Sequence, residues 1–357
     1  MDLLAISLVK PNGFWEAIIF GMENGVKNYA LALILVTIII KLVMVPLDFI
    51  NKYTSKKSSR KQAEMKPELD KINAKYGNDK ATLNQKTMEC YKSHNFNIMG
   101  TCLGMLMYLV LTMVVFFTLF SSLNGISYYK IGDQFLQVRE AYFAAYDIDV
   151  NTLDKSAIDT YNLLSDEEKS AKEGIARQNA YDKFEDTKTS FLWIDNIWIA
   201  DSAFKSPVMD YDTFIEKSSL TEEEVSAEEY ELVMGHIESS VRKSNGFFIL
   251  ALLAAGLNYL SISVNSWISR AKAKKQGIDP RLVSQGSNKI MTIVMPVIMG
   301  VFTLFYNAAF GLYIVAGALI ALITSPLVTM FVDMLEIEAI KKEQEKTVAV
   351  YDRKRRK

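Results

Sequence analysis

The sequence has 357 residues; half of them are hydrophobic, 23% are charged, and the formal net charge is −1. The apolar and the charged residues are segregated along the chain, which indicates a membrane protein with soluble parts. The two cysteines, Cys90 and Cys102, both precede the long polar segment 121–245. That segment therefore has neither a disulfide framework nor a cysteine metal site.

The first residues are not a typical secretory signal, because the apolar stretch 1–9 lacks a basic leader and residues 10–13 interrupt it. Residues 14–26 mix aromatic, aliphatic and acidic side chains directly before the first long apolar segment. They predict an amphipathic helix lying in the membrane interface, within an N-terminal external segment at 1–28. The alternative is a fraying first turn of the first membrane span.

Five apolar segments predict transmembrane helices, since a helix needs about 20 apolar residues to cross the hydrocarbon core. The fourth segment has only 17 residues. A short connection at 307–310 predicts that the last two spans, within 290–332, form a tight hairpin. The predicted spans are 29–49, 98–120, 246–267, 290–306 and 311–332. The predicted fold class is therefore an all-α polytopic membrane protein with five transmembrane helices.

The segments between these spans differ in charge. Residues 50–97 carry 11 lysines and arginines against 5 acidic residues, whereas residues 121–245 carry 12 against 25. The loop 268–289 carries 6 against 1, and the tail 333–357 carries 8 against 6. Because short basic loops stay in the cytoplasm, the sequence predicts an N-terminus outside, a cytoplasmic C-terminus and an external acidic lobe at 121–245.

Two of these segments carry helical patterns. In residues 50–97 an apolar stripe at helical spacing precedes a turn signal at 76–79, and a second stripe follows it. The pattern predicts a basic, antiparallel helical hairpin in the cytoplasm; the alternative is a mere spacer. In the acidic lobe, residues 220–224 and 226–229 each place a hydroxyl before acidic residues, as at a helix start. We expect this lobe to be α-helical. The first stripe consists of Met65, Leu69, Ile72 and Tyr76, and the second of Leu83, Cys90 and Tyr91.

Lys41 stands within the apolar segment 29–49. An ionisable residue in a membrane span costs roughly 2.5–3.5 kcal/mol by insertion scales, so it usually faces protein or water and marks a functional site. The alternative is that the side chain extends toward the interface. Thr37 lies one helical turn before Lys41, on the same helix face.

Residues 40–47, which include Lys41, resemble the end of the first core span in the YidC/Oxa/Alb membrane insertase family, where an arginine stands at the position of Lys41. Residues 65–79 resemble the cytoplasmic hairpin of that family, and 95–103 resemble the entry into its second span. Residues 191–195 are similar to the segment before its third span, and 291–313 to its last hairpin. The chain is identified on these motifs as a member of bacterial YidC type with an enlarged external loop.

Three features depart from the family pattern. Lysine replaces the usual arginine at position 41, which keeps the charge but loses the planar fork. Gly104 and Tyr108 stand where family members often have a proline and a glutamine. The external loop is longer, with additional sequence in 122–189 and 202–245, which adds a partner site or a protective cap.

The resemblance implies a membrane insertase and chaperone that inserts and helps fold nascent membrane proteins without nucleotide hydrolysis. A positively charged groove, open to cytoplasm and lipid, would receive the substrate, with Lys41 supplying the charge. The implied partners are nascent membrane proteins, the lipid bilayer, the ribosome and the Sec translocon, but no DNA. The candidate groove-lining residues are Thr37, Tyr108, Thr112, Asn258, Ser261, Asn265 and Thr303.

The basic tail end is a candidate contact for the ribosome or for anionic lipid, which the same charges attract. Its residues are Arg353, Lys354, Arg355, Arg356 and Lys357. The sequence contains no GxSxG, P-loop, HExxH or CxxC motif, so we expect no enzymatic activity, cofactor or metal site. The expected location is a bacterial plasma membrane. The alternatives are a small secondary transporter and a receptor-like protein acting through the external lobe.

Overall fold

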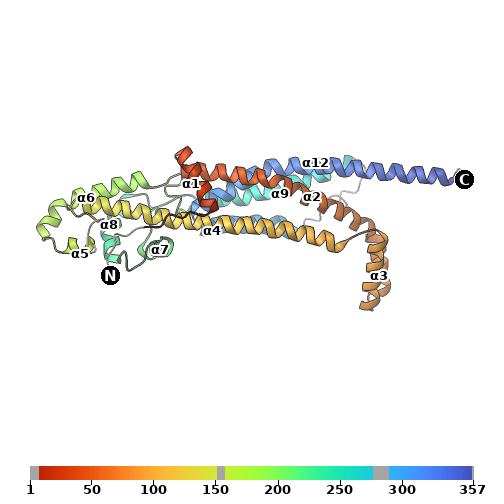
Figure 1. The fold of residues 1–357 in the computed structure, drawn as a ribbon, viewed down its shortest axis with the longest axis horizontal. Helices are drawn as coiled ribbons and strands as arrows, with labels where there is room; N and C mark the ends of the chain where they lie inside the picture. The colour runs from red at the N-terminus through yellow and green to blue at the C-terminus, as the bar shows by residue number, and fades with distance from the viewer. Residues whose placement is uncertain (1–7, 151–156, 276–288, 356–357) are drawn as a thin grey trace. The chain divides into compact units, whose positions relative to one another are not determined.

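The structure, a computed structural model, describes residues 8–150, 157–275 and 289–355 (Figure 1). In these residues the regular structure is helical, and one isolated β-bridge joins Phe191 and Ile194. The all-α prediction is therefore confirmed. The helices are α1 (Phe14–Val26), α2 (Tyr29–Tyr76), α3 (Lys80–Ser93), α4 (Ile98–Ala144), α5 (Ala157–Asn162), α6 (Asp166–Thr187), α7 (Tyr211–Lys217), α8 (Ala227–Ser240), α9 (Ile249–Lys275), α11 (Lys289–Phe305) and α12 (Ala308–Arg355).

Four helical segments of the described chain are long and apolar enough to cross a membrane. A fifth, Thr292–Phe305 in α11, is apolar but shorter. The protein is thus a polytopic membrane protein, and the count of five spans stays a prediction. The four long segments are Tyr29–Tyr76, Leu106–Ala144, Ile249–Lys272 and Ala308–Ala339.

Helices α2, α4 and α12 continue well past the apolar segments that predicted them. The residues that follow the apolar segments of α2 and α12 are mostly good helix formers, so the helices continue past the expected membrane boundary. The continuation of α4 instead carries buried apolar residues at helical spacing, among them Ile131, Phe135 and Val138. Three prolines lie inside these helices, Pro46 and Pro67 in α2 and Pro326 in α12. Each of them removes one backbone hydrogen bond but does not end its helix.

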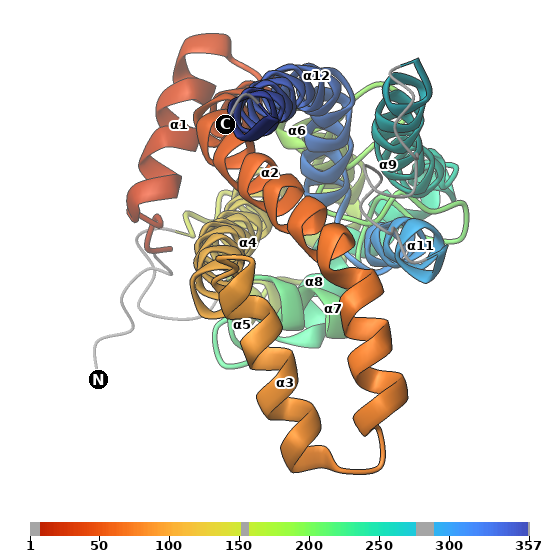
Figure 2. The ribbon, with the colours of Figure 1, turned by 90° about the vertical axis from the view of Figure 1, so that its right-hand side faces the viewer.

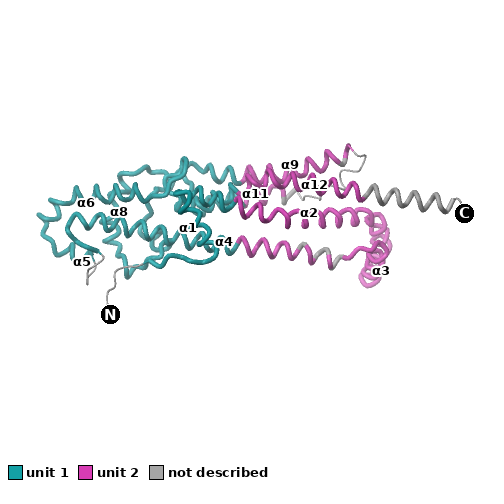
Figure 3. Tube along the Cα trace, turned by 45° about the horizontal axis from the view of Figure 1, so that its top comes forward, with its two compact units in different colours: residues 1–37, 117–254, 299–316 teal, residues 38–116, 255–298, 317–357 magenta. Residues whose placement is uncertain are grey.

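The chain forms two compact units, shown in different colours in Figure 3. Unit 1 consists of residues 1–37, 117–254 and 299–316, and unit 2 of residues 38–116, 255–298 and 317–357. Unit 1 therefore contains the acidic lobe at 121–245. Unit 2 contains the main part of α2, all of α3, and the segments of α4, α9 and α12 that carry the candidate site.

The helix predicted at the N-terminus forms with the predicted bounds as α1. Within unit 1 it contacts α4: the Trp15 indole N–H donates to the Thr118 hydroxyl at 3.0 Å, and Glu23 pairs with Lys130 at 2.8 Å. These contacts explain why the segment forms a separate helix and not a frayed turn of α2. Its position in the membrane interface stays a prediction.

The described part of the acidic lobe is mostly helical, as predicted, and residues 188–210 between α6 and α7 form turns and loops. Helix α8 begins at Ala227 because the Ser226 hydroxyl accepts the N–H of Glu229. The earlier stretch with the same chemistry forms only a turn, closed by the Val225 N–H donating to the Thr221 carbonyl. Two capping hydroxyls five residues apart therefore produce one turn and one helix.

A buried asparagine organises the loop structure of unit 1. Asn245 is fully buried, and its amide donates to the carbonyls of Asn196, Ile199 and Ala200 at 2.8, 3.2 and 3.0 Å. Its side-chain oxygen accepts the Asn196 N–H at 2.8 Å. An amide side chain can satisfy several backbone groups at once. Asn245 therefore holds the loop at 196–200 in one conformation.

Helix α3 follows α2 after the predicted turn, and Figure 2 shows it running back beside the last turns of α2. Asp79 caps α3, and hydrogen bonds from the Thr82 side chain and backbone lower the pKa of its carboxyl. Met65 of α2 and Cys90 of α3, one from each predicted apolar stripe, are both buried. The cytoplasmic location of this pair of helices stays a prediction.

Candidate functional site

A row of charged residues follows one face of α2 within unit 2, and we call it the α2 stripe. It consists of Lys41, Asp48, Lys52, Lys56 and Arg60. At 3.6 residues per turn, steps of four and seven residues keep side chains on one face of a helix. The stripe therefore extends the face of Lys41 along almost 20 residues of helix.

Lys52 is held by polar groups of α12. Its ammonium donates to the Ser325 carbonyl at 2.9 Å and to the Thr329 hydroxyl at 3.0 Å. Asn265 of α9 joins the same network, since its amide donates to the Ser325 hydroxyl at 2.8 Å and its oxygen accepts from Thr329 at 3.0 Å. Three helices of unit 2 thus share one hydrogen-bonded cluster around a lysine.

The next two cations of the stripe pair with carboxylates of α12. Lys56 forms an ion pair with Asp333, and the two side chains are only 11% and 3% exposed. The Arg60 guanidinium lies 2.9 Å from the Glu336 carboxylate. Lys272 of α9 lies 4.0 Å from the second oxygen of Asp333. Such buried charges are tolerated only when paired, which fixes the positions of these helices within unit 2.

Helices α9 and α12 each contribute a polar row to this arrangement. In both rows the residues are three or four positions apart, so each row follows one helix face. With the α2 stripe they bring together five cations, including Lys272, and three carboxylates, a net positive charge. The α9 row is Ser261, Asn265, Ser269 and Lys272, and the α12 row is Ser325, Thr329, Asp333 and Glu336.

Toward its N-terminal end, the α2 stripe contacts α4 through Asp48. The Tyr108 hydroxyl donates a hydrogen bond to the Asp48 carboxylate. Lys41 lies seven residues before Asp48, whose charge acts on it electrostatically. Among the described residues the Lys41 ammonium has no hydrogen bond or ion pair, whereas Lys52 and Lys56 are each held by several partners. Within the stripe, Lys41 is therefore the lysine whose donors are open to a ligand.

The remaining predicted groove residues divide between the two units. Thr112 lies one turn after Tyr108, and its hydroxyl donates to the carbonyls of Tyr108 and Leu109 in the same helix. Asn258 lies on α9, seven residues before Asn265. Thr37 and Thr303 belong to unit 1, are buried, and donate to the carbonyls of Leu33 and Gly300. Their hydroxyls are satisfied within their own helices.

The predicted tail contact lies at the C-terminal end of the described residues. Arg353, Lys354 and Arg355 form the last residues of α12, while Arg356 and Lys357 lie outside the described residues. Most of the predicted basic loop, at 276–288, lies outside them as well. The tail contact and this loop therefore stay predictions.

Sequence reasoning missed most of the charged network. Lys52, Lys56 and Arg60 fall within the predicted loop 50–97, where the sequence analysis compared only the total numbers of basic and acidic residues. Asp48 lies near the end of the apolar segment 29–49. The signal that identifies them is the spacing of Asp48, Lys52, Lys56 and Arg60, four residues apart. That spacing is visible in the sequence once the helix is extended past the predicted span.

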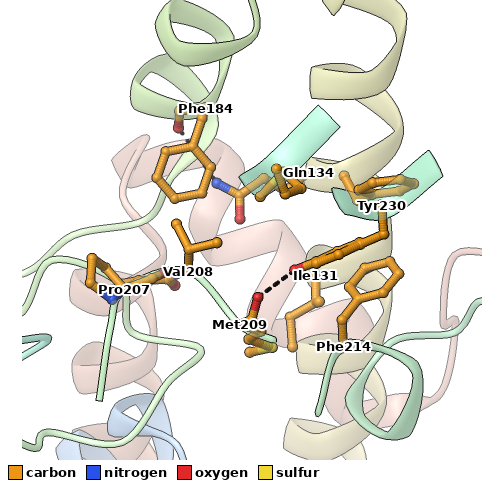
Figure 4. A pocket seen from close by; sticks show the side chains of 11 residues that line it. Ile131, Gln134, Phe184, Pro207, Val208, Met209, Phe214 and Tyr230 are labelled. Carbon is orange, nitrogen blue, oxygen red and sulfur yellow. Dashed lines mark hydrogen bonds between the residues drawn. The ribbon is translucent and has the colours of Figure 1, made fainter. Parts of the chain in front are cut away.

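Two cavities lie in unit 1, and none of their lining residues belongs to the charged network of unit 2. One has a volume of about 230 Å³ and mixes aromatic and charged lining residues, among them Trp198, Asp210 and Tyr306. The other, shown in Figure 4, has about 20 Å³, room for about one water molecule. There Tyr230 donates to the Met209 carbonyl at 2.7 Å, and burial raises the pKa of its hydroxyl.

Comparison with known proteins assigns the chain to a family. Residues 21–334 match the family described as 60Kd inner membrane protein. A membrane protein insertase YidC from Fusobacterium nucleatum subsp. nucleatum is 40% identical over 94 residues, which are 26% of this chain and 44% of that protein. The YidC of Clostridium tetani is 36% identical over 119 residues, 33% of this chain and 50% of that protein.

A third relative, the membrane protein insertase YidC of Syntrophus aciditrophicus, is 41% identical over 102 residues, 29% of this chain and 17% of that protein. The chain thus spans half or less of the length of these relatives. The family match, in contrast, covers most of the present sequence, including all of the α2 stripe and both polar rows except Glu336. The chain belongs to the 60Kd inner membrane protein family.

Proposed function

We propose that the chain is a membrane protein insertase and chaperone of a bacterial plasma membrane, which inserts and helps fold nascent membrane proteins. The names of its relatives and the family match support the general activity. The observation that carries the proposal is the α2 stripe, in which Lys41 is open while the following cations are held by α9 and α12. In a membrane protein, an unpaired cation of this kind is a functional site by default.

In the proposed mechanism, Lys41 attracts a short acidic or polar segment of the substrate into a hydrophilic groove. At an effective dielectric constant of about 20, two opposite charges about 4 Å apart attract each other by roughly 4 kcal/mol. That attraction offsets part of the cost of moving a polar segment out of water, while the apolar part of the substrate enters the lipid. Transfer of an apolar span is downhill, so the process requires neither nucleotide hydrolysis nor enzymatic chemistry.

The paired cations of the stripe have a different role in this mechanism. Lys52, Lys56 and Arg60 hold α2 against α9 and α12 within unit 2. This framework keeps Lys41 and Tyr108 in place when a substrate enters. Tyr108, Thr112, Asn258, Ser261 and Asn265 line the groove.

The topology of the proposed insertase has five spans, an external N-terminus and a cytoplasmic C-terminus. Positive charge is concentrated in residues 50–97 and 268–289 and in the tail, which supports this orientation. The α2–α3 pair then forms the cytoplasmic hairpin. The basic tail contacts the ribosome or anionic lipid, and the Sec translocon is a further partner.

Insertion by the purified chain is the direct test of this function. Proteoliposomes containing the chain, without nucleotide or Sec components, are expected to convert a short single-span substrate into a protease-protected form. Protection severalfold above that in empty liposomes is the expected result, because the groove lowers the desolvation barrier. Equal protection in both preparations would contradict the proposal. Liposomes with an unrelated polytopic protein control for leakage of the bilayer.

A further inference from the structure

Three side chains with metal-binding atoms converge where α2 and α3 lie side by side. They are Glu68 of α2 and Cys90 and His94 at the end of α3, and their ligand atoms all lie within 4.8 Å of one another. The His94 Nε2 lies 3.0 Å from a Glu68 carboxylate oxygen. All three residues belong to unit 2.

The chemistry of this trio suits a borderline-soft divalent cation. Zn²⁺ prefers thiolate, imidazole and carboxylate ligands at about 2.0–2.3 Å, and three protein ligands leave a fourth position for water. Cys90 lies in the last turn of α3, and the backbone N–H of His94, the residue after the helix, donates to the Cys90 carbonyl at 3.2 Å. This four-residue spacing places the two ligands on one face. Adjacent ligands of a tetrahedral site of this size lie roughly 3–4 Å apart, so small side-chain rotations suffice to close it.

The surroundings of the trio also favour binding. Cys90 is buried, while the side chains of Glu68 and His94 are 53% and 38% exposed. A cation can therefore reach the two exposed ligands from water before it contacts the thiol. Glu68 precedes Cys90 by 22 residues in the sequence, which is why no local motif indicated this site.

We propose that Glu68, Cys90 and His94 form a Zn²⁺ site that ties α3 to α2. Binding replaces the proton of the Cys90 thiol and the direct contact between His94 and Glu68 with bonds to the cation. His94 directly follows the last residue of α3, and Asn95 then adopts a positive φ of 50°. The cation would thus fix the helix pair at the point where the chain turns toward α4.

Metal binding to the purified full-length chain, carrying a tag without histidine, tests this proposal. After chelator treatment in detergent, Zn²⁺ alone is titrated against a chromogenic chelator, and Co²⁺ serves as a spectroscopic probe. The expected result is one tightly bound Zn²⁺ per chain and a thiolate-to-cobalt charge-transfer band. Cys90→Ser and His94→Gln are each expected to weaken Zn²⁺ binding at least about 100-fold, more than the loss of a group that only orients a ligand.

Matched variants make the outcome decisive. Cys102→Ser and His236→Gln remove the other cysteine and the other histidine, and both are expected to bind Zn²⁺ like the wild type. Circular dichroism of each variant shows that it is folded, and Cys90→Ser changes only one atom of the side chain. Zn²⁺ binding that is no tighter in the wild type than in Cys90→Ser would overturn the proposal. A cobalt spectrum without the charge-transfer band would do so as well.

Discussion

Lys41→Glu and Lys41→Ala are expected to abolish the rescue of an insertase-depleted bacterium, whereas Lys41→Arg is expected to retain it. The alanine variant loses a charge attraction of about 4 kcal/mol to an acidic substrate segment, and the glutamate variant replaces it with repulsion. Arginine keeps the positive charge at the same position of α2. Growth after depletion, with equal amounts of each variant in the membrane, is the measurement.

Lys57 provides the matched control for this series. It lies on the same helix but is exposed and outside the α2 stripe, so Lys57→Glu is expected to rescue growth like the wild type. Full rescue by Lys41→Ala would show that the charge at this position is dispensable for the essential substrates. In that case the proposed role of Lys41 would be wrong, although the family assignment would stand.

Asp333→Ala is expected to destabilise the protein by roughly 3–5 kcal/mol, because it leaves the buried ammonium of Lys56 without its carboxylate partner. Lys272, 4.0 Å from the same carboxylate, loses a neighbouring negative charge too. Thermal or denaturant unfolding of the detergent-solubilised protein, followed by its helical circular dichroism signal, measures the loss.

Two further variants separate charge pairing from general damage at this position. The double variant Lys56→Met and Asp333→Leu removes both charges and is expected to recover most of the stability, since apolar pairs often replace buried ion pairs without loss. Asp70→Ala removes an exposed carboxylate of α2 and is expected to change stability by less than about 0.5 kcal/mol. If Asp333→Ala is as mild as Asp70→Ala, the pair does not hold unit 2 together.

Apolar periodicity in the sequence predicted the helices of the fold well. The bounds of α1, the turn before α3, and the positions of α9 and α11 follow from local patterns of apolar, capping and turn residues. The ends of α2, α4 and α12 were not predictable in the same way. A change from apolar to polar side chains marks a membrane boundary, but in α2 and α12 lysine, glutamate and glutamine continue the helix. In α4 buried apolar residues at helical spacing continue it.

The sequence predicted four residues of the candidate site, Lys41, Tyr108, Ser261 and Asn265, but not the charged network to which they belong. Lys41 is conspicuous because a charge in an apolar span is costly. Lys56 and Asp333 are 277 positions apart in the sequence, and nothing local indicates that they pair. Thr37 and Thr303 were also predicted to line the groove; their hydroxyls donate to carbonyls of their own helices, and the groove role of both residues stays a prediction. A polar side chain in a span predicts a polar environment only when its helix cannot satisfy it.

An acidic segment of a nascent membrane protein is expected to contact Lys41 at the open end of the α2 stripe. The most direct measurement places a photoreactive residue beside an acidic residue of a ribosome-bound nascent chain and maps the cross-links by mass spectrometry. Cross-links to residues around Lys41, Tyr108 and Asn265 are the expected result. Cross-links confined to exposed apolar positions outside the α2 stripe and its polar rows, such as Leu252 of α9 and Phe305 of α11 at 72% and 71% exposure, would contradict it.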